Sequence, residues 1–583
     1  MLRRRLAGLP GDADGSLRRS RGRSLTSGKQ NGRRLVLNEK RERTRAFEKE
    51  RGLTRSWNYL QKLYERGTPA IANKMWKDDS AETEIVKGPP LKRYFECRTL
   101  HAAGLLLVVV VLAAPAYRNL GQYSDFYDGG VHLESARMVA SGYAPYRAVF
   151  ASQPPAWLEL IRLSFALFGQ SVHSGQVLTV SALVLTAVAV GFIVLDSGGW
   201  LGAVLACMTI LLSPLAFFWA REITGELTSA AFAVVALALA ARYVPSGTRL
   251  WLAGVALALA CALLVKLFGL YALAPALLIA AERWRSAGQL RRRVWYAVAD
   301  TLLVVGIMFG AVAAVALAYG PREVWTQAVA FHLASRTGAS PARNWGLIVT
   351  TLGGDPATFG VLPLAACAVL EPWIGWAALG WLALTLAGLL IQQPLFTHHV
   401  VCLIPPIALA AGIGLGALWK LGGQLRATGA NVGAGGYGRA AGIVALVAGF
   451  ILFATACRGG LAGRARQQWL LAFWRPPAAD LAVAAELARL TGKADFILTD
   501  AQGIAFWSGR EVPPWLADTS LKRIDNHYLE TAEVKSQIER YQVKAVLLWT
   551  GRLDHLPGLA AWLEQTFPTR HRYGTQGVLY VRP

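Results

Sequence analysis

Acidic side chains in two separate polar segments are the residues of this sequence best suited to chemistry. Asp128 opens the run Asp-Gly-Gly-Val-His-Leu-Glu-Ser-Ala-Arg, which ends at Arg137, and Glu222 and Glu226 lie in a second segment. Two carboxylates from separate loops can supply a general base or bind a divalent metal ion if both loops lie on one face. Asp128 also suits the N-cap of a helix over 131–139, and the sequence alone leaves both roles open.

Basic side chains accompany these acids. Lys266 interrupts the apolar stretch Cys-Ala-Leu-Leu-Val-Lys-Leu-Phe-Gly-Leu, and Arg221 directly precedes Glu222. A lysine at the centre of a membrane helix costs about 2.5–3.5 kcal/mol on insertion scales, so such residues are rarely accidental. We expect Lys266 to contact a phosphate. Arg221 could bind an anionic head group or neutralise the acids, and both roles stay open.

Histidines mark two later polar segments. His398 and His399 are adjacent, and adjacent side chains on a helix diverge, which is poor chelating geometry. We therefore expect this pair to hydrogen-bond substrate or to support a base rather than to bind zinc. His332 and Arg343 lie in another segment, where a solvated surface explains them nearly as well as a site does.

The elements that must position these residues are membrane helices. Of the 583 residues, 54% are hydrophobic and 16% are charged, a composition that excludes an ordinary soluble protein. Apolar runs predict about eleven spans, at 101–117, 174–195, 200–219, 227–243, 250–264, 268–281, 295–319, 357–371, 373–392, 400–419 and 440–457. We thus expect an α-helical polytopic membrane protein with a membrane domain over 96–460.

Arginine and lysine predict the orientation. With the N-terminus inside, the arginine-rich loop 282–293 and the loop 420–439 fall inside, as the positive-inside rule requires. The candidate residues then fall in the outside loops, at 118–173, 220–226, 265–267, 320–356 and 393–399, and the C-terminus is outside. Counting Pro154–Gly169 as a span would reverse this pattern, so we expect a surface helix there and a second one at Trp325–Ser335.

The two ends of the chain differ from the middle. Residues 1–95 are basic, with much of the formal net charge of +24, and no apolar signal segment follows their start. A disordered cytoplasmic tail, an extension upstream of a true start at Met75, or a nucleic-acid contact could each explain them. Residues 461–583 predict a small extracytoplasmic α/β domain, with strands at 496–498, 545–549 and 578–581 and helices at 480–490, 532–541 and 559–565. No phosphate-binding loop opens it.

The motifs resemble those of the GT-C type membrane glycosyltransferases, a superfamily that includes the protein O-mannosyltransferases and the bacterial aminoarabinose transferases (glycosyltransferase family 39-like). In them an Asp-Glu pair begins a helix in the first outer loop, an Ala-Arg follows, and Lys-Pro-Pro comes later. Asp128 falls on the catalytic Asp and Arg137 on the Arg, whereas Gly129 replaces the Glu and Gln153 the Lys.

Two later motifs extend the resemblance. Arg221 and Glu226 are similar to an Arg and an acid of the family's second outer loop, and Leu-Val-Lys266-Leu-Phe-Gly is similar to its Leu-Thr-Lys-Gly element. The resemblance covers about residues 100–460 and extends loosely to the terminal domain. Each motif is weak alone, but four occur in the right order on one predicted face.

The resemblance implies transfer of a hexose or pentose from a polyprenyl-phosphate donor to a glycan, lipid or protein acceptor, outside the bacterial cytoplasmic membrane. Asp128, with Glu226, would be catalytic, and Arg221 and Lys266 would stabilise the leaving phosphate. The substrate-binding candidates are Arg137, Tyr146, Glu222, His332, Arg343, His398 and His399. A divalent cation at the acids is left open, and no nucleic-acid partner is expected.

Two other classes of function compete with this hypothesis. A transporter or lipid flippase would need charged or broken helices near the membrane midplane, often in repeat-related pairs. The sequence shows no internal repeat, and its notable ionisable residues fall in loops or at span edges. A receptor-like scaffold whose function resides in the C-terminal domain is the third alternative.

Overall fold

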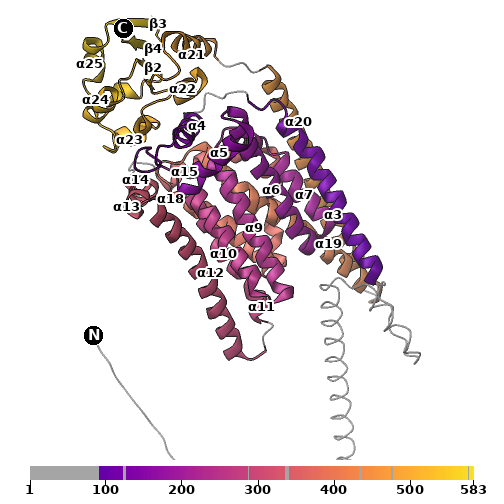
Figure 1. The fold of residues 1–583 in the computed structure, drawn as a ribbon. Helices are drawn as coiled ribbons and strands as arrows, with labels where there is room; N and C mark the ends of the chain where they lie inside the picture. Colours follow the sequence, from indigo (N-terminus) through magenta and orange to yellow (C-terminus); the bar gives the residue numbers. More distant parts are fainter. Residues whose placement is uncertain are drawn as a thin grey trace, which may run out of the picture. The chain divides into compact units, whose positions relative to one another are not determined.

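The computed structural model consists of long helices and one small sheet (Figure 1). It describes residues 91–583 except 122–126, 286–287, 335–339, 432–435, 474–476, 576 and 583. The expected basic tail therefore lies outside the described residues over 1–90.

Seven described helices are long and apolar enough to cross a membrane, so the chain is a multi-pass membrane protein. They are α3 (Leu91–Ala113) with η1 (Ala114–Tyr117), α6 (Val172–Ser197), α9 (Gly225–Ser246), η2 (Leu267–Ala272) with α11 (Leu273–Arg285), α12 (Leu290–Tyr319), α18 (Ile374–Ile391), and η5 (Thr397–Leu403) with α19 (Ile404–Asn431). An eighth candidate bends by 98° between α15 (Pro341–Gly353) and the helices α16 (Pro356–Phe359), α17 (Leu362–Ala366) and η4 (Cys367–Leu370).

The polytopic fold is thus confirmed, whereas the count of about eleven spans stays a prediction. Two apolar helices, α7 (Gly199–Leu211) and α10 (Arg249–Val265), are shorter than the others, and α20 (Gly436–Phe473) covers the expected span 440–457. The expected span 200–219 is broken after α7. Ser213 caps the short helix α8 (Pro214–Trp219), and Pro214 cannot continue the hydrogen bonding of the preceding helix.

The helix over Thr397–Gln424 occupies the centre of the membrane domain. Its most apolar 18-residue window is 100% buried, compared with 11% for the window of α12, which lies at the periphery. Glycines let neighbouring backbones approach α19 closely: a Cβ on Gly412 would lie 2.7 Å from the carbonyl oxygen of Gly202 in α7. Such small-residue contacts are the usual way in which membrane helices pack.

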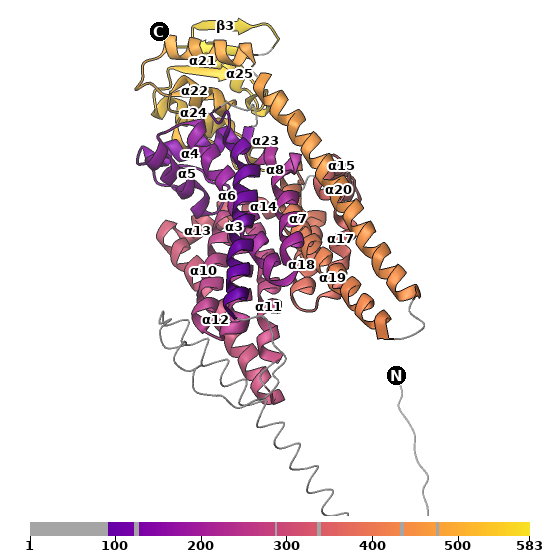
Figure 2. The ribbon, with the colours of Figure 1, turned by 90° about the vertical axis from the view of Figure 1, so that its right-hand side faces the viewer.

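Short helices gather at one end of the membrane domain, beside the sheet (Figures 1 and 2). They include α4 (Tyr127–Ala140), α5 (Pro155–Phe168), α13 (Pro321–Val324), the π-helix η3 (Trp325–Ala330) and α14 (Phe331–Ala334). The helices expected at Pro154–Gly169 and Trp325–Ser335 are therefore present as α5 and as η3 with α14. The end of α11 and the start of α12 lie at the opposite end of the membrane domain (Figure 1), and Arg283 and Arg292 belong to these helix ends.

The C-terminal part of the chain contains a four-stranded sheet in the order β1-β2-β4-β3. Its strands are β1 (Ile497–Thr499), β2 (Ala545–Leu548), β3 (Thr569–Tyr573) and β4 (Gly577–Val581). Its helices are α21 (Ala478–Leu490), α22 (Gln502–Ser508), η6 (Pro514–Leu516), α23 (Leu521–Asp525), α24 (Thr531–Arg540), η7 (Leu553–His555) and α25 (Leu559–Thr566). Strands β1 and β2 are parallel, with Leu498 opposite Val546, and β4 is antiparallel to both β2 and β3.

One apolar core joins this sheet to α4 and α5. Leu133 of α4 and Trp157 of α5 belong to the same buried cluster as Ile497, Leu547 and Leu579 of the sheet. Residues 92–583 accordingly form one compact unit. The helix α20 continues across the boundary expected at 460/461, and that boundary stays a prediction.

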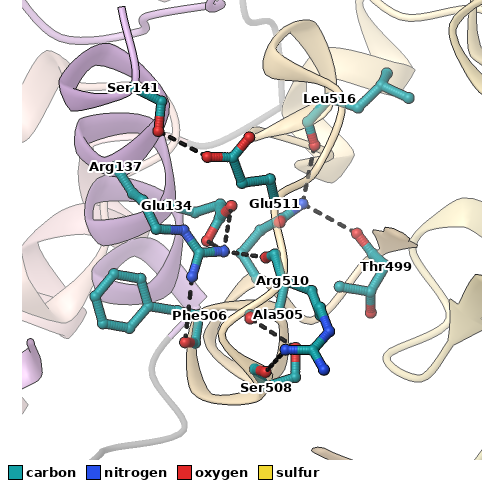
Figure 3. A network of polar contacts seen from close by, with 11 residues as sticks. Glu134, Arg137, Ser141, Thr499, Ala505, Phe506, Ser508, Arg510, Glu511 and Leu516 are labelled. Atoms are coloured by element: carbon teal, nitrogen blue, oxygen red, sulfur yellow. Dashed lines mark hydrogen bonds and ion pairs between the residues drawn. The ribbon is translucent and has the colours of Figure 1, made fainter. Parts of the chain in front are cut away.

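Polar contacts reinforce this junction (Figure 3). Arg137 forms a buried ion pair with Glu134 at 2.6 Å and donates hydrogen bonds to the backbone carbonyls of Phe506, at 3.4 Å, and of Arg510. Ser141 donates to the carboxylate of Glu511 at 2.7 Å. The last turns of α4 are thereby fixed to the segment that follows α22.

Candidate active site

A cavity of about 370 Å³ lies where α4, η2, η5, α14 and the C-terminal domain meet. Its wall carries ionisable side chains from both parts of the chain: Asp128, His132, Lys266, His332, His398, His399, Asp518, Lys522 and Arg552. Aromatic and apolar residues, among them Tyr127, Val131 and Phe396, fill the spaces between them. A mostly apolar hollow with a few convergent polar groups is the usual form of a ligand site.

Asp128 lies in the first turn of α4 and faces the cavity, with 41% of its side chain exposed. Its Oδ2 atom is 3.9 Å from Nε2 of His398. Although the side chain is exposed to the cavity, the protein atoms around it desolvate the carboxyl and raise the pKa of Asp128 to about 6, while the Lys266 ammonium opposes that rise. The carboxylate is therefore mostly ionised at neutral pH and has a pKa close to that of an effective general base.

A buried ion pair lies beside Asp128. Lys266, in extended conformation at the break between α10 and η2, places its Nζ atom 2.5 Å from Oε1 of Glu226 in the first turn of α9. Nε2 of His398 and Nε2 of His399 lie 3.6 and 3.8 Å from the same oxygen. The two histidines thus converge on one carboxylate, whereas the sequence predicted that their side chains would diverge.

Glu226, His398 and His399 offer ligand atoms within 4.8 Å of one another, a donor set that suits a divalent cation. The Lys266 ammonium lies against the same carboxylate oxygen, however. A metal ion at these three residues would therefore have to displace Lys266.

His132 and Tyr127 join the cavity wall although the sequence analysis did not single them out. Nδ1 of His132 lies 2.9 Å from the carbonyl oxygen of Ile223, which can only accept, so Nδ1 carries the proton. Burial lowers the pKa of His132 to about 4, and the ring is neutral at pH 7. Tyr127 accepts a hydrogen bond from the Thr519 amide at 3.0 Å, which connects α4 to the C-terminal domain.

His332 and Lys522 belong to a chain of hydrogen bonds in the cavity wall. Nε2 of His332 lies 2.6 Å from the carbonyl oxygen of Ser152, so Nε2 is protonated and Nδ1 can accept. Nζ of Lys522 donates to that Nδ1 at 3.0 Å. Burial lowers the pKa of His332 to about 3, and the nearby Lys522 charge contributes to this shift. Burial also lowers the pKa of Lys522 to about 8, and the nearby Lys266 charge adds to that shift.

Three predicted site residues stabilise the scaffold and do not line the cavity. Arg221 donates to the backbone carbonyls of Ala116, Arg118 and Asn119 at 3.1, 2.9 and 2.5 Å, and its burial lowers its pKa to about 10. The Tyr146 hydroxyl donates to the carbonyl of Gln153 at 2.6 Å. Arg137 binds the C-terminal domain as described above. The structure therefore gives these side chains partners other than a substrate.

The other predicted residues divide in the same way. Glu222 is buried and Arg343 is exposed near the start of α15, and neither lines the cavity. The structure brings together Asp128, Lys266, His332, His398 and His399 in the wall, with Glu226 directly behind Lys266. The acidic and basic cavity residues that the sequence analysis missed are in the C-terminal domain, where no recognised motif surrounds Asp518, Lys522 or Arg552.

Comparison with solved structures identifies the fold. The chain matches ArnT from Cupriavidus metallidurans bound to undecaprenyl phosphate, with a TM-score of 0.56 and 17% identity over 83% of this chain and 97% of ArnT. The apo structure of the same ArnT gives a TM-score of 0.55 and 15% identity, over 84% and 98% of the two chains. ArnT is a GT-C glycosyltransferase. This chain has the GT-C fold.

The predicted GT-C type architecture is therefore confirmed at the level of the fold. The chain also matches the oligosaccharyltransferase AglB from Archaeoglobus fulgidus, in complex with an inhibitory peptide and a dolichol-phosphate. That match has a TM-score of 0.46 and 11% identity over 85% of this chain and 75% of AglB. No family model matches the sequence, and no curated protein matches it.

Proposed function

We propose that this chain is a membrane glycosyltransferase that moves one sugar from a polyprenyl-phosphate donor to a hydroxyl-bearing acceptor. The observation that supports this proposal most is that the Asp128 carboxylate faces a cavity in a chain with the GT-C fold. Desolvation raises the pKa of this carboxyl to about 6. ArnT, which shares that fold, binds undecaprenyl phosphate. The acceptor is a glycan, lipid or protein on the outer face of a bacterial cytoplasmic membrane.

In the proposed reaction, Asp128 accepts the proton of the acceptor hydroxyl. The acceptor oxygen forms a bond to the anomeric carbon while the bond between that carbon and the phosphate oxygen breaks. The phosphate leaves with the electron pair, and attack opposite to it inverts the anomeric centre. General base assistance of this kind typically contributes about 10²–10⁴ in rate.

Glu226 and the neutral His132 support this step without taking the proton. The Glu226–Lys266 ion pair at 2.5 Å fixes the ammonium at the edge of the cavity, where its charge favours ionised Asp128. His132, neutral and held by the Ile223 carbonyl, leaves Nε2 able to accept a hydrogen bond from a sugar hydroxyl.

The test is transfer by the purified full-length protein in lipid nanodiscs. A panel of radiolabelled polyprenyl-phosphate hexoses and pentoses is incubated with cell-envelope glycan, lipid and protein fractions, and labelled acceptor is measured. We expect one donor to be used and Asp128→Asn to reduce the initial rate about 10²–10⁴-fold. Transfer that is unchanged in Asp128→Asn, or no transfer by the wild type with any donor and acceptor, would contradict the proposal.

A further inference from the structure

The cations around the cavity differ in whether a carboxylate already neutralises them. Lys266 is held 2.5 Å from Glu226, and Arg221 lies outside the cavity among backbone carbonyls. The two remaining cations of the wall, Lys522 and Arg552, both come from the C-terminal domain. Among the described residues, no carboxylate oxygen lies within 4.0 Å of the charged nitrogens of Lys522 or Arg552, so neither forms an ion pair.

Lys522 is held in place by neutral partners from two other parts of the chain. Its Nζ donates to Nδ1 of His332 at 3.0 Å and lies 4.8 Å from the ring centroid of Phe331. His332 is itself fixed by the carbonyl of Ser152 at 2.6 Å. These contacts hold the ammonium in the cavity wall through neutral partners, and Asp128 and Asp518 act on it only beyond ion-pair distance, which is the arrangement expected of a lysine that binds an anion.

Arg552 is positioned by a buried carboxylate at the end of β1. Asp500 accepts hydrogen bonds from the backbone amides of Trp549, Thr550 and Arg552 at 2.7, 3.0 and 2.9 Å, which fixes the loop that follows β2. The Arg552 guanidinium lies 3.8 Å from the centroid of the Tyr127 ring, next to Asp128. The loop thus presents a second cation to the cavity from the same domain.

We propose that Lys522 and Arg552 bind the phosphate of the polyprenyl-phosphate substrate, so that the C-terminal domain completes the active site. The inference rests on the proposed function for the reaction itself. The donor is a phosphodiester with one negative charge, and the leaving polyprenyl phosphate becomes a monoester with two. Two cations without an ion-pair partner among the described residues match this increase, because charge that develops in the transition state is stabilised best by preorganised opposite charge.

The electrostatic surroundings of Lys522 give the proposal a pH signature. The charged or titratable groups that face Lys522 are His332 from α14, Lys266 from the start of η2, Asp128 from α4, and Asp518 from its own domain. The pKa of Lys522 is lowered to about 8, chiefly by burial. Its charge is lost as the pH rises through about 8, which weakens the binding of phosphate and leaves Arg552 as the remaining cation.

The experiment measures binding of undecaprenyl phosphate and of uncharged undecaprenol to the full chain in nanodiscs. The variants are Lys522→Gln and Arg552→Gln, with Lys522→Arg and Arg552→Lys as charge-retaining controls. Lys493→Gln is the matched control, because Lys493 is an exposed lysine of the same domain outside the cavity. We expect each cavity Gln variant to weaken binding of undecaprenyl phosphate about 10- to 100-fold and to leave undecaprenol binding unchanged.

The charge-retaining variants and Lys493→Gln should bind both lipids nearly as the wild type does. The alkaline loss of undecaprenyl phosphate binding near pH 8 should disappear in Lys522→Arg, because arginine stays charged there. Equal binding of undecaprenyl phosphate by the wild type and both cavity Gln variants would overturn the inference. So would a parallel loss of undecaprenol binding, which would indicate a folding defect.

The two proposals fail in different ways. Sugar transfer that is unaffected by Lys522→Gln and Arg552→Gln, in a wild type that transfers sugar, overturns the phosphate-binding role and leaves the glycosyltransferase intact. A wild type that binds undecaprenyl phosphate through Lys522 and Arg552 but transfers no sugar supports the phosphate site and contradicts the proposed function.

Discussion

Desolvation raises the pKa of the Asp128 carboxyl, and the nearby Lys266 charge lowers it. The sequence left open whether this residue is a base or only begins a helix. Serine caps a helix about as well as aspartate, but it cannot accept a proton near neutral pH. We expect Asp128→Ser to insert normally and to lose activity as severely as Asp128→Asn, about 10²–10⁴-fold. Transfer assays on both variants, matched for membrane expression, check this, and an active Ser variant would favour the capping role.

The pKa of Asp128 sets the acid limb of the pH profile. Because burial raises this pKa to about 6, the carboxylate is protonated, and unable to act as a base, as the pH falls through that value. We expect kcat/KM for transfer to decline about tenfold per pH unit well below pH 6 and to level off above pH 7. A profile that stays flat down to pH 5, where an ordinary aspartate is still ionised, would show that Asp128 is not the titrating base.

The pair formed by Lys266 and Glu226 is a matter of stability as well as of function. Both side chains are buried, at 8% and 0% exposure. Lys266→Met leaves the Glu226 charge buried without its partner, which typically costs about 3–5 kcal/mol. We expect a lower thermal midpoint for the single variant and recovery of most of the loss in Lys266→Met/Glu226→Gln, measured by unfolding in detergent. Additive losses in the double variant would indicate that the pair contributes little.

At the scale of elements, helix α4 depends on Gly129 and Gly130, of which the sequence analysis noted only Gly129, as a departure from a family pattern. A Cβ on Gly129 would lie 2.7 Å from the carbonyl oxygen of Glu222, and one on Gly130 would lie 2.5 Å from the amide nitrogen of Gly503. Real Cβ atoms essentially never come this close to backbone. The position that carries Glu in the related pattern therefore has no room for a side chain here.

Gly130→Ala tests this contact directly. We expect the substitution to push α4 away from α22, to raise hydrogen exchange in both helices and to expose the C-terminal domain to protease. Gly306→Ala is the control, because Gly306 lies within the membrane helix α12 with nothing within 4 Å of the added carbon. Unchanged protection of α22 in Gly130→Ala would contradict the predicted contact.

The sequence predicted the strands that are apolar runs between turn residues and missed elements that lack this local pattern. The strands at 545–549 and 578–581 are apolar runs between turn residues, and β2 and β4 are found there. The strand β3 was missed because Thr-Arg-His-Arg-Tyr is polar: it lies at the sheet edge with most of its residues exposed. The break at Pro214 was missed because hydropathy averages over the short turn that interrupts the span.

Local sequence pattern predicted the residues of the candidate site less completely than it predicted the helices and strands. Asp128, Lys266 and His398 were predicted because an acid, a lysine or a histidine beside an apolar run is conspicuous. Lys522 was missed because its partner, His332, is 190 residues away, and no local spacing encodes such a contact. Arg137 and Arg221 were expected to be ligand residues because of the family resemblance, but buried backbone carbonyls satisfy a guanidinium equally well.

At the scale of the whole molecule, the arginine-rich ends of α11 and α12 lie at the end of the membrane domain opposite to the sheet (Figure 1). With the positive-inside rule, this arrangement predicts that the cavity opens on the outer side. A reporter active only outside the cytoplasm should be active when fused after Pro583 and silent when inserted at Gly288 between α11 and α12. The reverse pattern would place the cavity on the inner side and exclude the proposed reaction on the outer face.

The close approach of Gly130 to Gly503 restricts how this protein can be recombined with others. A chimera that takes its C-terminal domain from another chain must also take α4 and α5, because one apolar core and the Arg137 contacts cross the boundary. The natural unit of exchange is therefore a discontinuous module of α4, α5 and the sheet domain. Variation in acceptor preference among recombinants should follow this module and should not follow the membrane helices that lie between its two parts.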